Sequence, residues 1–134
     1  MARNASPPKR KTVLFVDDES LWLNAVKAAV RGGPVKVMTA AGGEEALEKM
    51  LRQRPDLILS DVRMPVMNGF DLYEKVKSNP KLRSIPYVFM SSIDDFDARK
   101  TAKDIGADDY VEKPFDATGV RSILAELLGR FYEQ

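Results

Sequence analysis

Short apolar runs and amphipathic segments alternate along this 134-residue chain. Five runs rich in aliphatic, β-branched and aromatic residues are typical of buried strands, at 12–16, 35–39, 57–60, 87–90 and 109–112. Between and after these runs, apolar residues recur with helical spacing, which predicts helices at 20–31, 44–54, 70–78, 95–105 and 120–131. Glycine and proline interrupt the pattern between several of these segments.

The regular alternation of strands and helices predicts an α/β domain in which helices cover both faces of a parallel sheet. The length suits one compact domain, which we assign to residues 12–134, after a flexible basic leader at residues 1–11. Residues 1–16 hold four basic residues and no acid, so the remainder carries 17 basic (21 − 4) and 20 acidic residues. A mildly acidic body binds nucleic acid poorly, so we expect no direct nucleic-acid binding.

The composition excludes several kinds of chemistry. The chain has no cysteine and no histidine, so it has no disulfide, no thiolate nucleophile, no Cys/His zinc site and no phosphohistidine of its own. No apolar run approaches the ~18 residues of a membrane helix, and the leader lacks the apolar core of a secretory signal. We therefore expect a cytoplasmic protein whose chemistry uses carboxylates, hydroxyls, lysine and an oxygen-liganded metal.

Polar residues follow four of the predicted strands: Asp17 and Asp18, Asp61, Ser91 and Ser92, and Lys113 and Pro114. In a parallel sheet these positions share one rim, where α/β proteins bind ligands. Three carboxylates at one rim repel each other, and Lys113 supplies too little positive charge to balance them. A hard divalent ion, Mg²⁺ in a cell, fits such a set of oxygen donors. Taken singly, each residue has an ordinary explanation as a cap or turn, but those explanations give no reason for convergence.

Four segments carry a family resemblance: VLFVDDE, DLILSDVRMPVMNG, IPYVFMSS and GADDYVEKPF. They resemble the signature blocks of response regulator receiver domains, the two-component signalling family that includes the chemotaxis response regulator. The resemblance covers residues 12–131, nearly the whole chain. It implies a flavodoxin-like, doubly wound (βα)5 fold with strand order 2-1-3-4-5.

The resemblance also implies a phosphorylation site. Asp61 matches the aspartate that accepts a phosphoryl group in a Mg²⁺-dependent reaction, with Mn²⁺ as a possible substitute. Asp18 matches the direct metal ligand, Asp17 an acid that reaches the ion through water, and the backbone carbonyl of Arg63 the remaining protein ligand. Lys113 matches the lysine that pairs with the phosphoryl oxygens.

Signalling roles follow from the same resemblance. Ser91 matches the hydroxyl that turns toward the phosphoryl group, and Tyr110 matches the aromatic switch residue. Together they imply a change in the surface formed by the fourth helix, fifth strand and fifth helix. The family usually has a cis bond before the proline that follows the lysine, here between Lys113 and Pro114.

The implied donor is a phosphohistidine on a histidine kinase or a histidine phosphotransfer protein. The implied output is a downstream protein or a covalently linked effector domain, and a homodimer through the fourth helix, fifth strand and fifth helix is one option. The domain is expected to catalyse only its own phosphorylation and slow dephosphorylation, and to have no membrane partner. The sequence leaves open whether this receiver stands alone or belongs to a longer protein.

Two local features prompt further hypotheses. Arg63 and Ile93 flank the expected path of the attacking water, so they are predicted to lengthen the phosphorylated lifetime. Leu21 and Leu23 lie off the main apolar stripe of the first helix, on either side of Trp22, and could mark a face where a partner docks.

Three alternative functions fit the sequence less well. A Mg²⁺ phosphatase with an aspartyl-phosphate intermediate usually needs an acid where this chain has Arg63. A flavin carrier of the same topology needs a phosphate loop after the first strand, where Asp17, Asp18 and Glu19 would repel phosphate. A degenerate receiver that serves only for docking would lack essential residues, and none is missing.

Overall fold

The computed structural model describes residues 10–92, 94–114 and 116–132. Its core is one five-stranded parallel sheet in the order β2-β1-β3-β4-β5. The elements alternate along the chain as β1 (Lys11–Val16), α1 (Ser20–Val30), β2 (Val35–Ala40), α2 (Gly43–Arg52), β3 (Leu57–Asp61), α3 (Gly69–Ser78), β4 (Tyr87–Ser91), α4 (Phe96–Asp104), β5 (Asp109–Glu112) and α5 (Ala117–Tyr132). The predicted fold class and strand order are confirmed.

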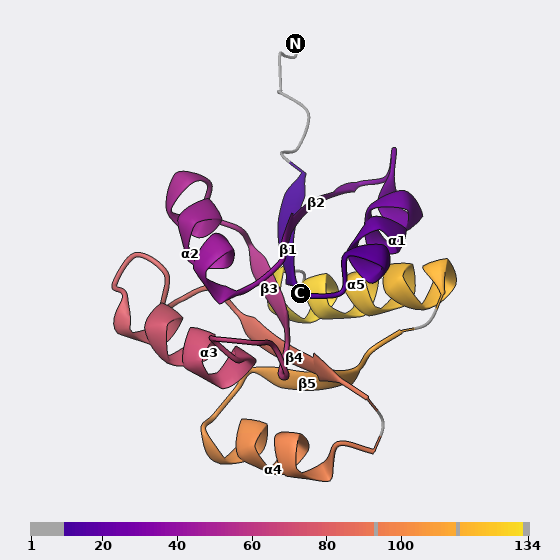
Figure 1. Cartoon of the computed structure of the whole chain (residues 1–134). Coiled ribbons are helices and arrows are strands. Elements are labelled where there is room, and N and C mark those ends of the chain that lie inside the picture. Colours follow the sequence, from indigo (N-terminus) through magenta and orange to yellow (C-terminus); the bar gives the residue numbers. More distant parts are fainter. Residues whose placement is uncertain (1–9, 93, 115, 133–134) are drawn as a thin grey trace.

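The helices cover the sheet as two layers. In Figure 1, α1 and α5 lie together at one side of the sheet, while α2, α3 and α4 lie at the other. Alternate residues of each central strand belong to opposite cores: Leu14 belongs to the core that includes residues of α2, α3 and α4, whereas Phe15 belongs to the core that includes residues of α1 and α5. Strands buried on both faces explain why the sequence shows continuous apolar runs rather than alternation.

The sheet register brings the carboxyl ends of the strands to one rim. Val16 of β1 pairs with Ser60 of β3, so the residues that follow, Asp17 and Asp61, lie at the same height. Asp61 pairs in turn with Met90 of β4. These strands flank the point where strand order reverses, which is where ligands bind in open α/β sheets.

The loop after β3 is held tightly against the rim. Asn68 caps α3 by accepting a hydrogen bond from the Asp71 backbone N–H at 2.9 Å, and the Asp71 carboxylate accepts one from the Asn68 N–H at 3.1 Å. The next residue, Gly69, donates its N–H to the Val62 carbonyl at 2.8 Å. A Cβ at Gly69 would lie 2.3 Å from the backbone oxygen of Asp61. The absence of a side chain therefore lets α3 begin directly beside Asp61.

Two expectations are wrong. Leu23 was expected off the apolar stripe of α1, yet it is buried in the α1–α5 core, and only Leu21 is exposed, at 84%. The peptide bonds of the described residues are all trans, so Lys113–Pro114 is not the cis bond that the resemblance implied.

The expected leader at 1–11 lies largely outside the described residues, and β1 already begins at Lys11. Within the described part of the chain, no helix has the length and apolarity needed to cross a bilayer.

Gly69→Ala is expected to destabilise the protein by about 2–4 kcal/mol, because the added methyl group collides with backbone rather than with a flexible side chain. Gly42→Ser is the matched control: a Cβ there meets nothing within 4 Å, and Gly42 is the N-cap of α2, where serine is favoured. Urea denaturation of both variants measures the difference. Equal stability of the two would contradict the close packing of α3 on Asp61.

Candidate functional site

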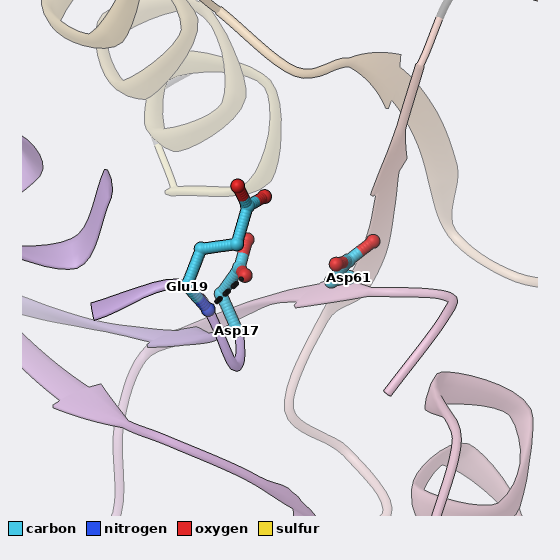
Figure 2. Close-up of side chains that lie close together, drawn as sticks. All are labelled: Asp17, Glu19 and Asp61. Carbon is cyan, nitrogen blue, oxygen red and sulfur yellow. Dashed lines mark hydrogen bonds between the residues drawn. The ribbon is translucent and has the colours of Figure 1, made fainter. Parts of the chain in front are cut away.

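Two buried carboxylates form the centre of the rim. Asp61, the last residue of β3, is 9% exposed, and Asp17, directly after β1, is fully buried. Figure 2 shows Asp61 across a short gap from Asp17 and Glu19, which come from the turn between β1 and α1. One oxygen from each of the three carboxylates lies within 4.8 Å of the others. Such a cluster has the spacing of a cation site.

Lys113 is the cation that the fold places among these acids. Its Nζ lies 2.6 Å from Asp17 Oδ2 and 2.5 Å from Glu19 Oε1. Its backbone N–H donates to the Ser91 carbonyl at 2.9 Å, which continues the pairing of β5 with β4. The next carbonyl, that of Pro114, accepts a hydrogen bond from Trp22 Nε1 at 3.0 Å. The loop after β5 is thereby tied to both β4 and α1, which fixes the position of the lysine.

Burial makes the ionised state of the rim costly. Desolvation and, secondarily, the charge of Asp17 raise the pKa of Asp61 to about 6, against the stabilising effects of Lys113 and the backbone N–H groups of Arg63 and Val62. Burial likewise raises the pKa of Asp17, although its contacts with Lys113 and the Glu19 N–H oppose the shift. Desolvation alone would lower the pKa of Lys113, but the bonds to Asp17 and Glu19 outweigh it and raise the pKa. The positive charge of Lys113 therefore does not balance the negative charges of Asp17, Glu19 and Asp61.

The residues fit a divalent cation. Asp17 Oδ2 is buried, and Lys113, its charged partner among the described residues, is shared with Glu19. Three carboxylates beside one ammonium group leave net negative charge at the rim, which a further cation would balance. Mg²⁺ prefers oxygen ligands of this kind.

The structure brings together only part of the set predicted from sequence. Asp17, Asp61 and Lys113 meet as expected, whereas Asp18 is exposed and lies outside the three-carboxylate cluster. Glu19, not predicted as a site residue, takes part instead, because its N–H donates to Asp17 Oδ1 at 2.8 Å and the tight turn directs it to Lys113. The run of three consecutive acids was the signal that could have found it. The role of Asp18 as a direct metal ligand stays a prediction.

Ser91 and Arg63 are joined by a residue that the sequence did not indicate. The Ser91 hydroxyl donates to Asp95 Oδ2 at 3.0 Å, and the Arg63 guanidinium makes two hydrogen bonds to the same carboxylate, at 3.0 and 2.8 Å. Ile93, paired with Arg63 in the hypothesis on lifetime, lies outside the described residues.

Tyr110 lies in β5, half-buried beneath α4. Its hydroxyl is buried without a hydrogen-bond partner in the described part of the chain, and the Arg99 guanidinium carbon lies 4.9 Å from the ring centroid. A buried hydroxyl without a partner lacks hydrogen-bond energy that it would have in water. The switch role of Tyr110 stays a prediction.

Comparison with known proteins decides the family. The chain matches the response regulator receiver domain over residues 13–125, most of its length. This protein belongs to the response regulator receiver family. The receiver is 32% identical over 126 residues to the DNA-binding transcriptional regulator NtrC of Escherichia coli K12, covering 94% of this chain and 26% of that protein. It is 38% identical over 120 residues to the probable transcriptional regulatory protein TcrX of Mycobacterium tuberculosis, covering 89% and 50%.

Solved structures agree with this assignment. The chemotaxis response regulator CheY4 of Vibrio cholerae is 31% identical to this receiver with a TM-score of 0.79, covering 90% of this chain and all (100%) of that one. A response regulator from Chloroflexus aurantiacus is 30% identical with the same TM-score of 0.79, covering 91% and 100%. The receiver thus spans a quarter to a half of the two curated relatives named above, but the full length of these two structures.

Asp61→Asn is expected to stabilise the protein by about 1–2 kcal/mol at pH 7 in the absence of divalent cations. The pKa of Asp61 rises from 3.8 to about 6 on folding, so ionisation of Asp61 costs stability increasingly as the pH rises through this range. As the pH falls below about 6 the carboxyl group becomes protonated in the folded state, so most of the gain should be lost by about pH 4 and the rest below the unfolded pKa of 3.8.

Urea denaturation in EDTA at pH 4 and pH 7 measures this difference. Asp104→Asn is the control, because Asp104 is exposed and pairs only with Lys100 across one turn of α4 among the described residues. A gain for Asp61→Asn that is equal at both pH values would argue against an electrostatic origin.

Proposed function

We propose that this receiver accepts a phosphoryl group onto Asp61 from a phosphohistidine on another protein, in a Mg²⁺-dependent reaction in the cytoplasm. The observation that carries the proposal is a buried aspartate at the carboxyl end of the sheet, beside a second buried carboxylate and a lysine that this carboxylate shares with Glu19. This arrangement offers a nucleophile, a fixed positive charge and part of a cation site in one place.

The chemistry requires little from the protein beyond positioning and charge. An Asp61 carboxylate oxygen attacks phosphorus, the P–N bond to the donor imidazole breaks, and the electron pair returns to that nitrogen, which takes up a proton. With a pKa of about 6, Asp61 is largely ionised at pH 7, so it needs no general base. Lys113 Nζ, held by Asp17 and Glu19, can turn to the phosphoryl oxygens as their charge appears.

The metal would be held by Asp17 and Asp61, together with Asp18 and the backbone carbonyl of Arg63 implied by the family resemblance. When bound, Mg²⁺, or Mn²⁺ in its place, neutralises charge on the phosphoryl oxygens. Glu19 and Asp17 share Lys113, so a metal ion that binds Asp17 would also change how Lys113 is held.

Signal output would follow from the added charge of about −1.5 to −2. We propose that the Ser91 hydroxyl moves to the new phosphoryl oxygens and that Tyr110, whose hydroxyl has no hydrogen-bond partner among the described residues, changes position with it. Both residues adjoin the α4–β5–α5 face, which would carry the signal. Among the relatives, NtrC is named as a DNA-binding transcriptional regulator, and a relative from Caulobacter vibrioides, 36% identical, as a protein-glutamate methylesterase/protein-glutamine glutaminase. We therefore propose either a linked effector or a separate downstream protein as the recipient.

Intact mass spectrometry after treatment with acetyl phosphate tests the proposal. With Mg²⁺ present, the wild-type protein should gain the mass of one phosphoryl group, and EDTA should abolish the gain. Asp61→Ala should gain nothing, because it lacks the attacking carboxylate. Asp104→Ala, which removes an exposed acid on α4, should behave as wild type. Equal phosphorylation of Asp61→Ala would place the acceptor elsewhere and overturn the proposal.

A further inference from the structure

The Ser91 hydroxyl has a fixed partner in this structure, and that partner is not at the phosphorylation site. Ser91 is the last residue of β4 and is 4% exposed. Its Oγ donates to Asp95 Oδ2 at 3.0 Å. A serine hydroxyl carries one hydrogen, so the bond to Asp95 and a bond to a phosphoryl group on Asp61 exclude each other.

Asp95 is the centre of a network that joins three segments. It accepts hydrogen bonds from Ser91 at the end of β4, from Arg63 in the loop after β3, and from the Ala98 backbone N–H in the first turn of α4. Its side chain is 12% exposed, and the fork of Arg63 holds its pKa at about 2. Charge-assisted, two-point bonds of this kind are stronger and more directional than neutral ones.

The two carboxylate oxygens of Asp95 accept hydrogen bonds from different groups. Oδ1 accepts from the Ala98 N–H at 3.3 Å and from Arg63 Nη2, which is sufficient for the helix cap. Oδ2 accepts from Ser91 and from Arg63 Nε. A cap alone needs only one oxygen, so the contact with Ser91 is additional to capping.

We propose that Asp95, held by Arg63, is a positioning residue that keeps the Ser91 hydroxyl away from Asp61 until a phosphoryl group on Asp61 accepts the hydroxyl's hydrogen bond instead. This inference rests on the proposed function. The phosphoryl oxygens must then compete with Asp95, so the network sets how strongly the phosphorylated conformation is favoured. Because the same carboxylate caps α4, loss of the Ser91 bond is transmitted to the start of the helix at the signalling face.

The test uses variants that preserve the cap. Serine and asparagine cap helices about as well as aspartate, but neither offers Arg63 a charged carboxylate with two oxygens. In the Asp95→Ser variant, the shorter serine side chain cannot both cap α4 and accept the hydrogen bond from Ser91. The probe is beryllofluoride, a phosphoryl analogue, titrated with Mg²⁺ present. Trp22, the single tryptophan, reports binding because its ring centroid lies 4.7 Å from Lys113 Nζ.

Asp95→Ser is expected to bind beryllofluoride about fivefold more tightly than wild type, equivalent to ~1 kcal/mol, because Ser91 is no longer retained. Asp95→Asn should shift the affinity in the same direction. In a Ser91→Ala background the Asp95→Ser change should have no effect, since the hydroxyl through which it acts is missing. Lys100→Gln, which removes an exposed ion pair on the same helix, should match wild type.

Three results would overturn the inference. Unchanged or weaker binding by both Asp95 variants, with a normal wild-type response, removes the positioning role and leaves the proposed function intact. The same gain in the Ser91→Ala background shows that Asp95 acts through another group. A wild-type protein that does not respond to beryllofluoride at all removes the proposed function itself, and this inference with it.

Discussion

The ion pair between Lys113 and Asp17 is the interaction on which the rest of the rim depends. It joins the loop after β5 to the turn after β1, although these strands lie at different places in the sheet with β3 and β4 between them. Trp22 supports the same connection by donating to the Pro114 carbonyl. A fully buried carboxylate without such a partner would cost several kcal/mol, so the pair is a condition for placing Asp17 beside Asp61 at all.

The pair leaves the rim with unbalanced charge, and this imbalance is the basis of the proposed function. Lys113 is shared between Asp17 and Glu19, while Asp61 stays close to both acids and has a raised pKa. A divalent cation relieves the repulsion among the carboxylates. A phosphoryl group brings negative charge to the same place, which explains why Lys113 and a metal would be needed together.

The sequence predicted the fold and the meeting of Asp17, Asp61 and Lys113 at one rim, for physical reasons. Continuous apolar runs mark strands buried on both faces, and the alternation with helices leaves few topologies. Because parallel strands end at one rim, Asp17, Asp61, Ser91 and Lys113 could be placed near each other without coordinates. These predictions depend on periodicity and strand direction, which sequence reports directly.

What the sequence did not predict depends on turn and side-chain geometry. Glu19 joins the cluster because the turn after Asp17 redirects the chain, and Asp95 reaches Ser91 because α4 begins one residue later than expected, which makes Asp95 the cap. Leu23 is buried because α5 packs on that side of α1. Apart from the three consecutive acids at 17–19, the one-dimensional pattern gives no signal for these contacts, since they depend on turn geometry and on where a neighbouring element lies.

Thermal unfolding at increasing Mg²⁺ concentration tests the central claim, that the buried carboxylates form a cation-dependent site. At pH 7 the wild-type protein should become more stable with the logarithm of the Mg²⁺ concentration above its Kd, by ~2.7 kcal/mol at a hundredfold excess over the Kd. Asp61→Asn, already relieved of one negative charge and lacking one ligand, should be stabilised much less. Equal stabilisation of both proteins, or none in the wild type, would contradict the account.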